Sequence, residues 1–94
     1  MLYMVTARFK PGVEAEHAAL AQEFGDHLRQ PLLHIRLVGA LKDGDGKTIG
    51  VHLLMEADGR QQVDRFLDQS PYKQAGLYQR IEVDELEIEA GGLT

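Results

Sequence analysis

Four histidines and two aspartates are the residues of this chain best suited to acid–base chemistry. They are His17, His27, His34, His52, Asp43 and Asp45, and the two aspartates alternate with glycines near the middle of the sequence. A neutral imidazole beside a carboxylate can act as a general base near pH 7, because the carboxylate fixes the tautomer of the ring. The chain has no cysteine, which excludes a thiolate nucleophile, a thiolate metal site and disulfides.

The aspartate–glycine run at residues 43–46 has two interpretations. It resembles the start of a calcium loop, but the twelfth residue from Asp43 is Leu54, where an EF-hand needs a glutamate. The second interpretation is a tight hairpin, because glycine takes the positive φ that such turns need. We therefore predict a hairpin turn in which Gly44 and Gly46 both take that conformation.

The remaining histidines suggest a metal site only weakly. His34 and His52 are expected on neighbouring strands, and two imidazoles need at least one further ligand. The nearest acidic residue on the same strand face as His52 is Glu56, about 13 Å along the strand. The sequence also has no glycine-rich phosphate loop and no nucleophile elbow. We predict no metal site.

The hydrophobic pattern predicts elements in the order β-α-β-β-α-β. Alternating apolar residues predict strands, and apolar residues at helical spacing predict helices. The predicted strands span residues 2–9, 32–41, 48–56 and 79–89, a first helix spans residues 13–29, and a second helix follows Asp58 as its N-cap. We expect a single domain over residues 1–94, of class α+β, with the ferredoxin-like plan of two helices on one face of a four-stranded antiparallel sheet.

The predicted sheet has two faces with different neighbours. In the second strand, Ile35 and Leu37 are expected to share a face. In the last strand the apolar phase shifts between Val83 and Leu86, which predicts a bulge near residues 84–85. The face opposite the helices carries apolar residues from several strands, so a second subunit is expected to cover it. We therefore predict a homodimer.

Two segments resemble the YCII-related (YciI-like) family of small α+β proteins. The first is the turn from Gly39 to Lys47, and the second is residues 70–77, SPYKQAGL, which lead from the second helix to the last strand. The family carries Asp-Pro-Tyr-x-x-Ala-Gly at the second place, and Ser70 stands where the family usually has the aspartate. The resemblance implies a dimeric α+β barrel.

The resemblance also implies a histidine–aspartate pair. Asp43, four residues after Gly39, occupies the place of the family's aspartate. Counting back from the turn without gaps puts the family's histidine within residues 22–24, where this chain has none. His27, one turn later on the helix, is the first candidate to replace it, and His17, nearer the centre of the apolar stripe, is the second.

Each of these site residues also has an interpretation without catalysis. His27 fits a helix-end residue that the helix dipole favours, and His17 fits a histidine at the edge of the core. The expected pocket lies between the first helix, the turn at Asp43 and the segment that contains Ser70 and Tyr72, which would contact the substrate. Tyr72 alternatively packs the end of the second helix against the sheet.

Three functions follow from these observations. The resemblance implies a small-molecule enzyme that uses the pair for acid–base proton transfer in a lyase, elimination or isomerisation reaction, without a cofactor. The second is a cofactor-free monooxygenase of the antibiotic-biosynthesis type, which residues 5–12 resemble equally well. The third is a non-catalytic dimeric module that binds a metabolite.

Composition excludes other partners. The net charge is −5, and the isoelectric point is near 5.2, whereas a surface that binds nucleic acid or anionic lipid needs a basic patch. No apolar run approaches the roughly 18 residues of a membrane-spanning helix, and the first residues lack the basic start of a signal peptide. We expect a cytoplasmic protein whose partners are a second copy of itself and a small molecule.

Overall fold

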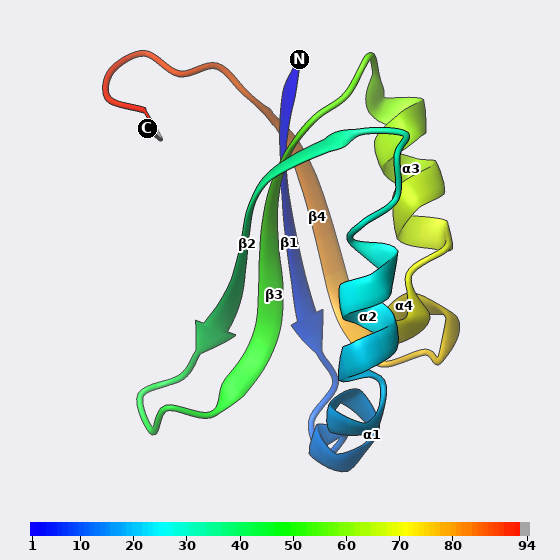
Figure 1. Ribbon diagram of the computed structural model, residues 1–94. Helices are drawn as coiled ribbons and strands as arrows, with labels where there is room; N and C mark the ends of the chain where they lie inside the picture. The colour runs from blue at the N-terminus through cyan, green and yellow to red at the C-terminus, as the bar shows by residue number, and fades with distance from the viewer. Residues whose placement is uncertain (93–94) are drawn as a thin grey trace.

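Within residues 1–92, which the computed structural model describes, the chain forms four strands and four helical segments (Figure 1). They are β1 (Leu2–Phe9), α1 (Glu14–Ala19), α2 (Ala21–His27), β2 (His34–Lys42), β3 (Thr48–Glu56), α3 (Arg60–Asp68), α4 (Pro71–Gln74) and β4 (Tyr78–Leu86). Because α1 and α2 follow one another directly, and α3 and α4 nearly so, the order reduces to β-α-β-β-α-β. None of the described helices is long and apolar enough to cross a membrane.

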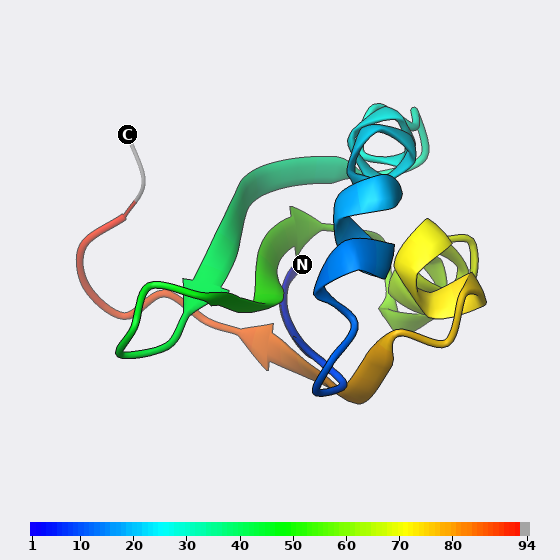
Figure 2. The same cartoon turned by 90° about the horizontal axis from the view of Figure 1, so that it is seen from below.

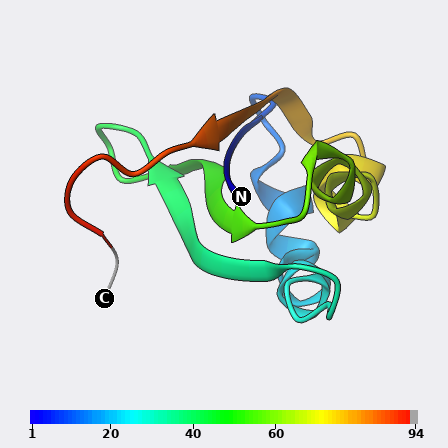
Figure 3. The same ribbon diagram turned by 90° about the horizontal axis from the view of Figure 1, so that it is seen from above.

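The strands form one antiparallel sheet in the order β2-β3-β1-β4. Views along the sheet from below and from above show all the helices on one side of it (Figures 2 and 3). This is the ferredoxin-like arrangement, so the predicted fold class is confirmed. We call the side without helices the open face.

Alternation along the strands separates the core from the open face. The core-facing residues of β1 and β3 are buried together with residues of the helices; the main members are Tyr3, Val5, Ala7, Phe9, Phe24, Val51, Leu53, Met55, Val63, Phe66, Leu67 and Tyr72. The strict alternation of burial along β1 is the signature of a strand with one covered face. The core therefore lies between the sheet and the helices, as the hydrophobic pattern predicts.

A bulge in β2 changes which apolar side chains reach the open face. Ile35 pairs with Met55 on the core side, but Leu37 pairs with Leu54 on the open side, and the register shifts between Ile35 and Leu37. The prediction that Ile35 and Leu37 share a face is therefore wrong, because one extra residue reverses every following side chain. As a result Leu37 joins the open face.

The predicted bulge in the last strand is also misplaced. The pairing of β4 with β1 is continuous from Leu86 to Arg80, and the register shifts only at the other end, between Arg8 and Phe9. Leu86 is out of phase with Val83 simply because it lies on the open face, opposite Leu2. Beyond it, the segment that ends the described chain turns back over this face beside Leu37 and Leu54.

Both helical regions differ in detail from the prediction. The first bends at Leu20, whose φ and ψ of −98° and 2° separate α1 from α2. The second begins after Gly59, not Asp58, and the Asp58 amide instead donates to Oε1 of Gln62, 2.8 Å away. Gln62, the third residue of the helix, thus accepts a hydrogen bond from an amide that precedes the helix. The prediction that Asp58 is the N-cap is therefore wrong, because Gly59 takes that position.

The turn between β2 and β3 is tight and closed by hydrogen bonds. The Gly46 amide donates to the Asp43 carbonyl over 3.1 Å, and the Asp43 amide donates to the Lys47 carbonyl over 3.0 Å. Gly46 takes a φ of 80°, whereas Gly44 stays outside the positive-φ region. The predicted hairpin is confirmed, and only the second of its two glycines needs the left-handed conformation.

Candidate functional site

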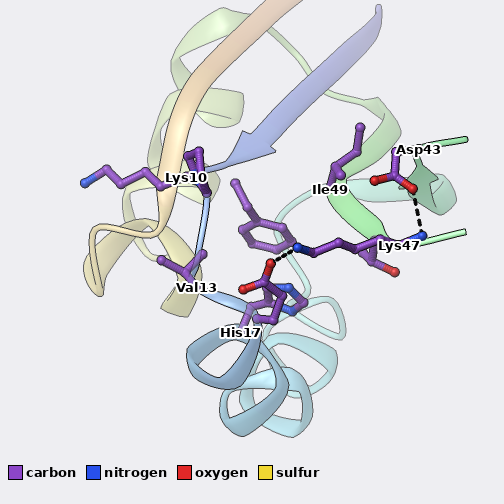
Figure 4. A pocket seen from close by; sticks show the side chains of 10 residues that line it. Lys10, Val13, His17, Asp43, Lys47 and Ile49 are labelled. Carbon is purple, nitrogen blue, oxygen red and sulfur yellow. Dashed lines mark hydrogen bonds and ion pairs between the residues drawn. The ribbon is translucent and has the colours of Figure 1, made fainter. Parts of the chain in front are cut away.

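A small cavity opens at the end of the sheet where β1 stops, α1 begins and the β2–β3 hairpin turns. Its volume is about 210 Å³, and its lining residues are Phe9, Lys10, Pro11, Val13, Glu14, His17, Asp43, Lys47, Thr48 and Ile49 (Figure 4). The three lining segments meet here because β1 and β2 both run antiparallel to β3 and so end at the same edge of the sheet. A cavity of about 150 Å³ accommodates benzene, so this one has room for a single substituted ring.

His17 forms part of the cavity floor. Its imidazole stacks on the ring of Phe9, with centroids 4.2 Å apart and planes 8° apart. Behind this pair, Tyr72 presents its edge to both rings at 5.2 Å from Phe9 and 6.4 Å from His17. The aromatic cluster therefore fixes the plane of the imidazole, and the side chain stays half-buried rather than enclosed.

Asp43 stands across the cavity from His17 (Figure 4). Its Oδ1 accepts hydrogen bonds from the amides of Asp45 and Lys47, each 2.9 Å long. Within the described residues, no hydrogen bond or ion pair joins the Asp43 carboxylate to the His17 ring. The two groups therefore share a cavity without touching, and a ligand between them would contact both.

An ion pair links the two walls of the cavity. Lys47, at the end of the hairpin turn, extends its side chain toward His17 and pairs with the carboxylate of Glu14 on α1 (Figure 4). The hydrogen bond from Lys47 lowers the pKa of Glu14, and the same contact raises the pKa of Lys47. Both groups are therefore charged at neutral pH, and Lys47 brings a cation to the cavity on the side of His17 (Figure 4).

The sequence matches the YCII-related domain over residues 1–87. The chain belongs to the YCII-related family. This confirms the resemblance seen in the turn at Asp43 and in the segment from Ser70 to Leu77. No curated protein matches the chain by sequence.

Solved structures place the YCII-related chain among proteins of the same fold. It is similar to 5-chloro-2-hydroxyhydroquinone dehydrochlorinase (TftG) from Burkholderia phenoliruptrix AC1100, solved in complex with 2,5-dihydroxybenzoquinone, with 23% identity over 93% of this chain and 94% of that one and a TM-score of 0.85. It is less similar to an uncharacterised NIPSNAP domain protein from Burkholderia xenovorans, with 20% identity over 99% and 98% of the two chains and a TM-score of 0.58. At these identities the likeness is one of fold.

Of the two histidine candidates, the structure brings His17 to Asp43 and keeps His27 away. The His27 ring stacks on Phe66 at 4.3 Å, and its Nε2 lies 2.8 Å from the Phe66 carbonyl oxygen. His27 thus ties α2 to α3 and does not line the cavity. The expected pairing of His27 with Asp43 is not formed, because α2 carries His27 along the sheet away from the hairpin turn.

Ser70 and Tyr72 lie one layer behind the cavity. Tyr72 is buried against Phe24, with ring centroids 4.4 Å apart, and burial raises its pKa. The Ser70 side chain is buried, and its hydroxyl lies beside the phenol of Tyr78. Neither residue lines the cavity, so any effect of theirs on a ligand would act through the aromatic cluster around Phe9.

Sequence reasoning predicted Asp43 but missed the lysines and the glutamate of the cavity. Lys47 directly follows the hairpin turn and Glu14 opens α1, and topology alone puts these two positions at one edge of the sheet. The other histidines lie elsewhere: His52 is on the open face, where its Nδ1 is 3.3 Å from Thr6 Oγ1. Among residues 1–92 no three side chains of metal-ligating type are grouped.

Proposed function

We propose that this YCII-related protein is a small-molecule enzyme in which His17 accepts or donates a proton during an elimination or isomerisation. The observation that carries this proposal is the position of His17: it is the one histidine that lines the cavity in the described structure, held flat against Phe9 and facing a lysine and an aspartate. A positioned imidazole is the side chain best suited to proton transfer near neutral pH.

The substrate that suits the cavity is a single hydroxylated ring. The volume of about 210 Å³ fits one ring, and Phe9, Val13 and Ile49 supply apolar walls. The structural relative named a 5-chloro-2-hydroxyhydroquinone dehydrochlorinase acts on such a ring. Elimination of HCl transfers one proton from the substrate to a base while chloride leaves with the bonding electron pair, and His17 is the group that would take that proton.

Asp43 acts from the opposite side of the ligand in this proposal. Its carboxylate holds the hairpin turn and faces His17 across the cavity rather than contacting it. A ring bound between them would place one edge near the imidazole and the other near the turn. Asp43 therefore serves as a positioning residue for the site.

The test measures chloride release from 5-chloro-2-hydroxyhydroquinone by the parent protein, by His17→Phe and by His27→Phe. The first substitution keeps the ring stack on Phe9 but removes the proton-carrying nitrogens, so we expect the rate to fall by about 10²–10⁴-fold. His27→Phe changes a histidine of similar exposure outside the cavity and should keep the parent rate. Equal rates for all three proteins, or a loss confined to His27→Phe, would contradict the proposal.

A second candidate is a module that binds the ring without converting it. The missing hydrogen bond between His17 and Asp43 favours it, since a catalytic imidazole is usually oriented by a partner. The parent protein would then bind 2,5-dihydroxybenzoquinone and release no chloride. The same experiment therefore separates the two candidates.

We also propose that a second copy of the chain covers the open face. Leu37, Leu54 and Leu86 lie on this face around the turned-back segment after β4, and Leu37 remains 43% exposed. Contiguous exposed apolar surface of this kind is typical of interfaces. The oligomeric state of the protein in solution tests this proposal.

A further inference from the structure

The ion pair between Lys47 and Glu14 joins two walls of the cavity that belong to different segments of the chain. Lys47 belongs to the hairpin and Glu14 to α1, and their side chains are 54% and 43% exposed. Exposed ion pairs contribute only about 0–1 kcal/mol, because water competes for both charges. The pair can therefore open at low free energy, and Lys47 can exchange Glu14 for another anion.

The backbone of Lys47, by contrast, is firmly held. Its amide donates to Oδ1 of Asp43 over 2.9 Å, and its carbonyl accepts from the Asp43 amide over 3.0 Å. The base of the side chain is thus fixed at the cavity edge while the ammonium end moves. This arrangement presents one mobile cation, on a fixed stem, to whatever occupies the cavity.

The other lysine of the lining offers a different geometry. The side chain of Lys10 extends away from the cavity, whereas that of Lys47 extends across it toward His17 (Figure 4). Both residues add one positive charge at the same rim. Lys10 therefore provides a matched control for the effect of charge alone.

We infer that Lys47 is the anion-binding residue of the cavity and that Glu14 is an internal substitute for the ligand, displaced when an ionised oxygen on a ring binds. This inference rests on the proposed function, since it concerns the same cavity, and it adds the ligand class: a single ring that carries a phenolate or enolate oxygen. The ring packs against Phe9, Val13 and Ile49, and its ionised oxygen takes the place of the Glu14 carboxylate at Lys47. Bound in this way, the ligand lies above His17.

The experiment measures the dissociation constant of 2,5-dihydroxybenzoquinone by calorimetry for the parent protein and four variants. Lys47→Met should weaken binding about tenfold or more, because a hydrogen bond to a charged group is lost. Glu14→Gln should tighten binding by up to about fivefold, since the competing carboxylate is gone. The double variant should bind like Lys47→Met alone, because without the lysine there is no competition to relieve. Lys10→Met should stay within about twofold of the parent.

Inorganic phosphate serves as the anion without a ring. Saturable phosphate binding equal in strength to that of the quinone would overturn the ring requirement. Weaker or unchanged binding in Glu14→Gln, parent-like binding in Lys47→Met, or equal losses in Lys47→Met and Lys10→Met would overturn the displacement of Glu14. So would the absence of quinone binding by both the parent and Glu14→Gln. None of these results depends on turnover, so the His17 test fails or succeeds separately.

Discussion

The imidazole of His17 lies parallel to the ring of Phe9, with centroids 4.2 Å apart and planes 8° apart. Phe9 is in turn stacked on Tyr78, with centroids 5.5 Å apart. Three rings therefore stack in series, and two of them, Phe9 and His17, form the cavity floor. His17, in the last turn of the short helix α1, thus acquires a fixed orientation from Phe9, the last residue of β1.

This stack predicts how His17 affects stability. His17→Ala removes one ring, and aromatic pairs contribute about 0.5–1.5 kcal/mol beyond the area that they bury. We expect the free energy of unfolding to fall by about 1 kcal/mol in His17→Ala and to change less in His17→Phe, which restores the stack. Urea denaturation of both variants measures this difference. Equal stabilities would mean that the stack does not contribute.

Asp43 accepts hydrogen bonds that hold the hairpin turn, and it also brings a negative charge to the cavity. Two variants separate these two roles. Asn retains an Oδ1 that accepts the two amide hydrogen bonds, so Asp43→Asn should keep the stability of the hairpin. Asp43→Ala loses both bonds and should lower the free energy of unfolding by about 1–2 kcal/mol. Thermal and urea melts give these values. A loss of chloride release in Asp43→Asn at unchanged stability would assign a role to the charge itself.

The order of elements along the chain and the core follow from the hydrophobic pattern, but identifying the histidine at the site required the topology of the sheet. Because β1 and β2 are parallel to each other, the turn after β2 lies beside the end of β1 and the start of the first helix. Asp43 therefore shares a cavity with His17 and not with His27. The ungapped count points instead to residues 22–24 on α2, a segment that does not line the cavity.

The bulge in β2 was beyond sequence reasoning for a different reason. In a regular strand Ile35 and Leu37 would share one face, whereas the bulge places Ile35 on the core side and Leu37 on the open side. Both faces of the sheet carry apolar residues here, so the hydrophobic pattern does not distinguish the two arrangements. Only the packing of Ile35 against the core decides between them. The contact of Lys47 with Glu14 was likewise invisible, because it joins residues of two elements whose side chains are mostly solvated.

The two glycines of the hairpin turn provide a matched pair. Gly46 has a φ of 80°, and an added Cβ would meet no atom within 4 Å at either Gly44 or Gly46. Any difference between Gly46→Ala and Gly44→Ala therefore reports backbone conformation alone. We expect Gly46→Ala to lower the free energy of unfolding by about 1 kcal/mol and Gly44→Ala to leave it within about 0.5 kcal/mol. A larger loss in Gly44→Ala would contradict the turn geometry.

Tyr78 makes stability sensitive to alkaline pH. Burial raises the pKa of Tyr78 well above its ordinary value of 10.0. Below pH 10 the phenol is protonated in both the folded and the unfolded chain, so its contribution is fully present. Above pH 10 only the unfolded chain loses the proton, and stability falls by up to about 1.4 kcal/mol per pH unit until the folded phenol also ionises.

Tyr78→Phe has no proton to lose and should show a shallower fall above pH 10. Urea denaturation at pH 9, 10 and 11 measures the two slopes, and the difference between them isolates Tyr78 from the lysines and the other tyrosines. Identical slopes would show that Tyr78 ionises freely in the folded protein.

The open face predicts a homodimer that one charge can dissociate. Leu37 and Val38 are adjacent in β2 and similarly exposed, at 43% and 39%, but Leu37 pairs with Leu54 on the open face and Val38 pairs with Leu53 on the helix side. A lysine at position 37 would lie in the proposed interface without a partner, and burying an unpaired charge is strongly unfavourable. Light scattering should therefore give twice the monomer mass of 10.5 kDa for the parent and for Val38→Lys, and the monomer mass for Leu37→Lys at micromolar concentration. A monomeric parent would contradict the dimer outright. Dissociation of the dimer by both lysine variants would place the interface at the edge of β2 and not on the open face. Only an edge contact is within reach of side chains on both sides of that strand.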